Sequence, residues 1–200
     1  NILLVQREYI SDGKYSQTSR MCSVRNGSVM GSGVQVRDKA LKNLPPIHET
    51  ILLDSATGRY SSREHVQIWG LKPVPEAYSA AFPTSLEQVK NPPYSDWVFD
   101  MDEDGQLGVS MQATGLASGE LQGIQRKAFR LEGMALSKDR VLGLASMTKE
   151  SLVLSSTSRV LKPGRYTKGE SSSDTSASFF EEIRLENGAN CDAVRALVAA

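Results

Sequence analysis

Histidine and cysteine are both scarce in this chain of 200 residues, which contains two of each. No His-x3-His or Cys-x2-Cys spacing occurs, so the sequence offers no zinc site, and we expect neither a metal nor a cofactor. A Ser-His-Asp triad would have to use His48, in a proline-rich loop, or His65, in a strand-like run. Neither setting is typical of a catalytic base. The scarcity of histidine directs attention to lysine as the base of any hydrolytic site.

A charge surplus and a long apolar run are also missing. The 23 basic residues balance the 23 acidic ones, which predicts no overall attraction to nucleic acid or to anionic lipid. No apolar run approaches the roughly 18 residues that suggest a membrane span, and no secretory signal is visible. We therefore expect a soluble, intracellular protein without nucleic-acid or membrane partners. Cys22 and Cys191 are expected to be reduced thiols, because two cysteines cannot form a disulfide framework.

Short apolar and β-branched runs, bounded by turn residues, predict that the first half of the chain consists mainly of strands. These runs cover residues 2–6, 33–36, 50–54 and 65–69. Pro92 and Pro93 would break a helix or a central strand, so we place a lobe boundary there. Residues 1–93 then form a mainly-β lobe that walls a substrate cleft. Residues 94–200 form a second lobe of the same compact domain.

The second lobe mixes strand and helix patterns. Residues 120–134 carry apolar side chains at helical spacing and predict an amphipathic helix, although two glycines weaken the pattern. A short terminal helix is predicted at residues 191–198, and residues 151–161 fit either a strand or a helix. Strands are predicted at residues 97–99, 106–110, 141–145 and 179–185. The predicted fold class is therefore α/β or α+β.

An acidic segment follows the first predicted strand of this lobe. Asp100, Asp102 and Asp104, followed by Gly105, match the opening of an EF-hand calcium loop. Met111 stands at the last position of that loop, where calcium requires a bidentate Glu. Strands rather than helices are also expected on both sides. We therefore interpret the segment as a solvated acidic turn.

One serine and one lysine of the second lobe suit a catalytic pair. Ser110 and Lys149 are 39 positions apart (149 minus 110), and each follows a short apolar run that is typical of a strand. A serine hydroxyl becomes a nucleophile when a base takes its proton, and a neutral lysine amine can be that base. Backbone N–H groups around a serine at a strand end can supply an oxyanion hole.

Lysine acts as a base only when it is neutral, which requires a pKa well below its usual value of about 10.4. Burial lowers the pKa of a lysine, and apolar residues flank Lys149 on both sides. Glu150 would oppose this effect only if it faced the amine, and adjacent side chains in a strand point to opposite faces. Lys127 fits less well, because we expect it on the solvated face of the helix at residues 120–134.

This lobe resembles the polyprotein-processing proteases of birnaviruses, which use a Ser/Lys dyad on a fold related to the proteolytic domain of Lon. The likeness rests on Gly108-Val109-Ser110, on Thr148-Lys149 and on a helix between them. It covers residues 97–161, whereas the first lobe is similar only in overall length. The Gly-Pro-Ser-Ala-Gly box of Lon itself is absent, which indicates that the chain does not descend from Lon proper.

The resemblance implies a serine endopeptidase with Ser110 as the nucleophile, its N–H in the oxyanion hole, and Lys149 as the general base. Such enzymes lie between a capsid precursor and a scaffold protein in a viral polyprotein, act in the host cytoplasm and cut after small residues such as Ala. They free themselves on both sides, so the chain end at Ala200 would be a product that can occupy an active cleft. The competing interpretation is a non-enzymatic viral or cellular binding or assembly module, in which Ser110 caps a turn and the first-lobe strands make the contacts.

Overall fold

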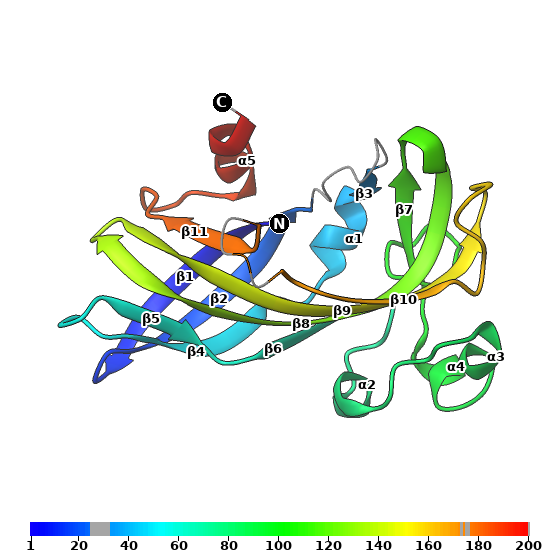
Figure 1. Cartoon of the computed structure of the whole chain (residues 1–200), viewed down its shortest axis with the longest axis horizontal. Helices are drawn as coiled ribbons and strands as arrows, with labels where there is room; N and C mark the ends of the chain where they lie inside the picture. Colours follow the sequence, from blue (N-terminus) through cyan, green and yellow to red (C-terminus); the bar gives the residue numbers. More distant parts are fainter. Residues whose placement is uncertain (25–32, 173, 175–176, 200) are drawn as a thin grey trace.

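The chain folds around one antiparallel sheet of eleven strands (Figure 1). This computed structural model describes residues 1–24, 33–172, 174 and 177–199. The strands are β1 (Ile2–Ser11), β2 (Lys14–Ser23), β3 (Val34–Val36), β4 (Ile47–Leu53), β5 (Arg59–Ser62), β6 (His65–Trp69), β7 (Val109–Ala113), β8 (Gly119–Ser137), β9 (Arg140–Ser156), β10 (Tyr166–Glu170) and β11 (Phe179–Ile183). The helices are α1 (Asp38–Asn43), α2 (Pro75–Ser79), α3 (Leu86–Val89), α4 (Tyr94–Trp97), a 3-10 turn (Gly115–Ala117) and α5 (Cys191–Ala199).

A long hairpin of β8 and β9 forms the centre of the sheet (Figure 1). β7, β6 and β5 pair one after another along the free edge of β8. β10 and β11 share the free edge of β9. The sheet continues from β5 through β4 and β2 to β1, and from β7 to β3. Strands from before and after Pro93 therefore belong to the same sheet.

Both faces of the central strands are buried. Ile68 and Trp69 are neighbours in β6 but belong to different apolar clusters, because successive side chains in a strand point to opposite faces. The Trp69 cluster includes Ala40 and Leu41 of α1, and the Ile68 cluster includes Ala77 of α2. A fully buried side chain of this size stabilises the fold by about 1.5–3 kcal/mol. β6 and the part of β8 that pairs with it therefore lie between two apolar layers.

The helix that we expected at residues 120–134 is wrong, because these residues form most of β8. Leu121 and Ile124 are three positions apart, as on a helix face, yet both are buried within a strand that is covered on both sides. The glycines that weakened the helix pattern serve close strand contact. Gly133 lies opposite Gly143 of β9, where a Cβ on Gly143 would come within 2.7 Å of the Phe180 ring.

Other local predictions have mixed outcomes. Six expected strands are confirmed: residues 65–69 match β6, and residues 2–6, 33–36, 50–54, 141–145 and 179–185 are strands whose ends differ. The strand expected at residues 106–110 is only partly confirmed, because β7 begins at Val109. The terminal helix is confirmed as α5, and residues 151–156 continue β9. The strand expected at residues 97–99 is wrong, because Trp97 ends α4 and Val98 makes only an isolated bridge to Leu71. The structure is mainly β rather than an even mixture of strands and helices.

The cysteines are not reduced thiols, which corrects our expectation. Cys22, in β2, forms a disulfide with Cys191, at the start of α5, across a separation of 169 residues. Arg195 of α5 donates a hydrogen bond of 2.8 Å to the Cys22 carbonyl and lies 3.6 Å from the Asp38 carboxylate. The terminal helix is thus tied to β2 and α1, and Ala200 lies outside the described residues. Disulfides are rare in the cytosol, so this bond does not support the expected cytoplasmic location.

No helix within the described ranges is both long enough and apolar enough to cross a membrane.

Candidate functional site

The acidic segment forms a tight loop in front of β7. The Asp100 carboxylate accepts hydrogen bonds from the N–H groups of Asp104, at 3.1 Å, and Gly105, at 2.7 Å. Gly105 has a φ of +86° and Glu103 a φ of +54°. A positive φ suits glycine and is uncommon for other residues. The loop is therefore a tight turn whose conformation depends on the Asp100 side chain and on a glycine at position 105.

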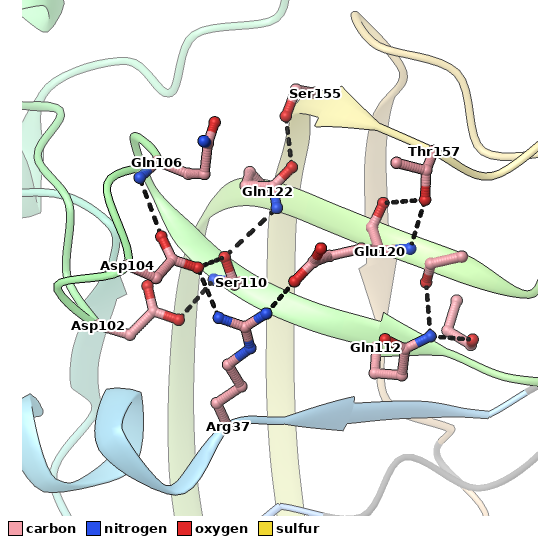
Figure 2. Close-up of polar contacts among 12 residues, drawn as sticks. Arg37, Asp102, Asp104, Gln106, Ser110, Gln112, Glu120, Gln122, Ser155 and Thr157 are labelled. Carbon is pink, nitrogen blue, oxygen red and sulfur yellow. Dashed lines mark hydrogen bonds and ion pairs between the residues drawn. The ribbon is translucent and has the colours of Figure 1, made fainter.

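Ser110 lies directly behind this loop, in β7, and is 1% exposed. Its hydroxyl donates a hydrogen bond of 2.6 Å to Asp104 and accepts one of 3.4 Å from the Gln122 amide (Figure 2). Its backbone N–H donates to Asp102 at 3.3 Å. The N–H that we expected in an oxyanion hole is therefore already bound to a carboxylate. A buried hydroxyl with two partners is also poorly placed to attack a substrate.

Asp102 is the most unusual member of the loop, because it is 2% exposed and one of its oxygens, Oδ1, has no hydrogen-bond partner among the described residues. Burial raises the pKa of Asp102, and the neighbouring charge of Asp104 raises it further. Burial works in the same direction on Asp104, but hydrogen bonds from the Ser110 hydroxyl and the Gln106 N–H, together with the charge of Arg37, outweigh it and lower the pKa of Asp104. The interpretation of this segment as a solvated turn is wrong for Asp102.

Arg37, between β3 and α1, links the loop to β8. Its guanidinium donates to Asp104 at 2.7 Å and also contacts the Glu120 carboxylate (Figure 2). Gln122, which contacts Ser110, accepts a hydrogen bond from Ser155 of β9. Ser110 is thus enclosed by a polar network that joins Arg37 to β7, β8 and β9. In this network the serine holds the loop against the sheet.

Lys149 lies elsewhere in the sheet. Ser110 is opposite Gln122, whereas Lys149 is opposite Lys127, five positions further along β8. At about 3.4 Å per residue, these positions lie roughly 17 Å apart along the strand. The two residues are also on strands that flank β8 on opposite sides. A proton transfer needs contact within about 3.2 Å, so the structure does not bring the predicted nucleophile and base together.

The structure nevertheless agrees with the burial of Lys149 that its flanking apolar residues predict. Burial lowers the pKa of Lys149, as we expected. Glu150 binds Arg126 at 2.6 Å and Tyr166 at 2.9 Å, and the alternation of the strand turns it away from the amine. Burial of a lysine thus follows from the flanking residues, whereas the position of the lysine relative to a serine does not.

Lys127 is the group that sequence reasoning missed. It is 5% exposed, and its amine lies 4.4 Å from the centre of the Trp69 ring. Burial, followed by the charge of Lys149, lowers the pKa of Lys127 to about 7. Our placement of Lys127 on a solvated helix face is wrong, because residue 127 is in the buried middle of β8. Once residues 119–137 are recognised as a strand that pairs on both edges, its burial follows.

An amine with a pKa near 7 is chemically able to act as a base or a nucleophile. Within the part of the chain that the structure describes, neither Lys127 nor Lys149 forms a hydrogen bond or ion pair. No described serine or threonine hydroxyl forms a hydrogen bond with either amine. The lysine pair and the Ser110 network are therefore two separate polar clusters in one sheet.

Comparisons of the chain with models of known families, with curated proteins and with solved structures returned no match.

Proposed function

We propose that this chain is a non-enzymatic assembly module that binds a second copy of itself through the outer face of β8, β9 and β11. The observation that carries the proposal is a group of large apolar side chains left exposed on this face. We call it the outer patch. It consists of Met134, Leu142, Phe179 and Ile183.

The strand register places the outer patch on one side of the sheet. Leu142 lies opposite Met134 of β8, and on its other side it faces Glu181 of β11, which has Phe179 and Ile183 two positions away. Residues directly opposite each other share a face. The alternate residues, such as Val141 and Phe180, point into the apolar cluster around Tyr60.

The side chains of the outer patch are exposed to solvent, and Phe179 is the most exposed of them at 59%. No described element covers the patch. Met134 and Leu142 are directly opposite, and Phe179 and Ile183 lie diagonally across from Leu142. Apolar side chains exposed together in this way mark interaction sites in soluble proteins. The buried core of this part of the sheet lies on the opposite face, so the patch is not required for folding of a single copy.

The charges around the outer patch suit a second copy as the partner. Arg140 pairs with Glu181 at 2.6 Å, and Arg130 pairs with Glu132 at 2.6 Å. Both signs are therefore present on one face, so a second copy would not meet a surface of a single repelling sign. A two-fold interface uses the same patch on both copies, so it requires such self-complementarity. A partner of a single strong charge would fit this surface less well.

The Ser110/Lys149 endopeptidase is supported less well. It requires an accessible hydroxyl and a lysine within reach of it. Ser110 is buried between Asp104 and Gln122, and Lys149 lies in another part of the sheet. Processing of a viral polyprotein would therefore need a different arrangement of this pair.

Sedimentation velocity over a range of concentrations tests the proposal. We expect the native chain to form dimers as concentration rises, and the double variant Leu142→Ser/Phe179→Ser to remain monomeric over the same range. Truncating central interface residues typically costs about 1–4 kcal/mol, so the dissociation constant should rise at least about tenfold. The changes are at exposed positions, and the variant should keep the native circular dichroism spectrum.

Leu116→Ser is the matched control, because Leu116 is 80% exposed but belongs to the 3-10 turn after β7, outside the patch. It should dimerise like the native chain. A native chain that stays monomeric at every concentration would refute self-association. Equal loss of dimer in the control and in the double variant would refute the assignment of the surface.

A further inference from the structure

Three carboxylates of the acidic loop converge on one point. One oxygen from each of Asp100, Asp102 and Asp104 lies within 4.8 Å of the others. Their spacing of two positions, followed by Gly105, is that of the first half of a calcium loop. Carboxylate oxygens are the ligands preferred by hard divalent cations.

Acidic clusters are common on protein surfaces, so the burial of Asp102 is the deciding observation. Its carboxylate is 2% exposed, and Oδ1 has no hydrogen-bond partner in the described part of the chain. The other oxygen, Oδ2, is held by the N–H of Ser110, which fixes the orientation of the carboxylate (Figure 2). A buried carboxylate oxygen without a partner is costly, and a cation between the three carboxylates would remove that cost.

The remaining contacts of the loop are compatible with a cation. Asp100 accepts two backbone N–H groups, and Asp104 accepts from Gln106, Ser110 and Arg37. Ionised carboxylates have about four lone-pair sites, so these bonds leave room for a metal bond. Arg37 supplies the only positive charge that contacts these three carboxylates in the described residues. It would compete with a cation for Asp104.

We propose that Asp100, Asp102 and Asp104 form a binding site for a divalent cation, with Ca²⁺ the preferred ion. Ca²⁺ accepts irregular oxygen cages, whereas Mg²⁺ demands a near-ideal octahedron and gives up water reluctantly. The loop lacks the bidentate Glu of an EF-hand, because Met111 occupies that position. The affinity should therefore be modest, with a dissociation constant of roughly 10⁻⁵ to 10⁻³ M.

The test is titration calorimetry with CaCl₂ and, separately, with MgCl₂, on chain first treated with a chelator. We expect one Ca²⁺ per chain and at least about tenfold weaker binding of Mg²⁺. In a thermal melt, 5 mM CaCl₂ should raise Tm by about 2–15 °C relative to the chelated chain, with the larger rise at the tighter end of this affinity range, because the ion binds only the folded state. No heat of binding and no change in Tm with either ion would overturn the proposal.

Two variants locate the site. Asp102→Asn keeps the shape of the side chain and should abolish both the heat of Ca²⁺ binding and the rise in Tm. Glu103→Gln makes the same change of charge one position away, on a side chain that pairs with Lys39 at 2.9 Å, and should keep both. Equal loss in the two variants, or binding retained by Asp102→Asn, would overturn the assignment.

Arg37→Met is expected to change the affinity for Ca²⁺ in the opposite direction from Asp102→Asn. Removing the competing guanidinium should tighten Ca²⁺ binding several-fold, because the cation then meets three carboxylates without a counter-charge. A variant that merely disturbed folding could not bind Ca²⁺ more tightly than the native chain. Weaker Ca²⁺ binding in Arg37→Met would contradict the competition between the arginine and the ion.

Discussion

Lys127→Met is expected to stabilise the protein by roughly 1–4 kcal/mol at pH 7, as replacement of buried charges by apolar side chains often does. The native lysine is 5% exposed, and burial together with Lys149 holds its pKa at about 7. The folded chain thus binds the proton less tightly than the unfolded chain, whose lysine has a pKa of about 10.4. Loss of the contact with Trp69 offsets part of the gain.

The same difference in pKa predicts a dependence on pH. Between pH 7 and about 10.4 the unfolded state binds more protons, so the stability of the native chain should rise with pH, by at most about 1.4 kcal/mol per pH unit. Below about pH 7 this lysine is protonated in both states, so the free-energy cost of burying its charge no longer changes with pH. Lys127→Met should show a flatter profile over this range. Urea unfolding at pH 6.5, 8 and 9 measures both effects.

Lys138→Met is the control, because Lys138 is exposed in the turn between β8 and β9. Its stability should stay within about 0.5 kcal/mol of the native value at every pH. Destabilisation by Lys127→Met, or a native profile that does not change above pH 7, would show that the amine is not buried as described.

Loss of the disulfide is expected to lower the free energy of unfolding by about 2–5 kcal/mol. Cys22 and Cys191 are 169 residues apart, and closing so long a loop restricts the unfolded chain strongly. The bond also fixes α5, which otherwise depends on Arg195 and a small apolar contact through Val194. We expect Cys22→Ser/Cys191→Ser to unfold at a lower urea concentration than the native chain.

Treatment with a reducing agent separates the disulfide from other effects of the substitutions. The reductant should lower the native midpoint to that of the double variant and should leave the variant unchanged. Equal midpoints for oxidised native chain and variant would mean that the bond contributes nothing. A variant that responds to the reductant would point to a different cause.

Much of the sheet follows from local pattern, because a half-buried strand alternates and its turns are marked by glycine or proline. β8 could not be recognised in this way. It is covered on both faces near Leu121 and Ile124, so its apolar residues lack the alternation of a strand. The disulfide was missed for a related reason, since the pairing of Cys22 with Cys191 is set by the docking of α5 and not by spacing.

For the predicted pair of Ser110 and Lys149, the sequence likewise predicts local burial but not the distance between the two side chains. Burial of Lys149 follows from its apolar neighbours, and the structure agrees. Its distance from Ser110 depends on the register of β7 and β9 against β8, which the separation of 39 positions does not fix. The acidic spacing was visible in the sequence, but the burial of Asp102 depends on the packing of the loop against Ser110.

We infer that Ser110 supports the acidic loop and does not attack substrates. Hydrolysis of peptides that contain Ala-Ala, followed by mass spectrometry, tests this claim directly for the native chain, Ser110→Ala and Lys149→Arg. We predict the same background rate for all three, because Ser110 is buried between Asp104 and Gln122. Cleavage by the native chain that both substitutions abolish would contradict the account.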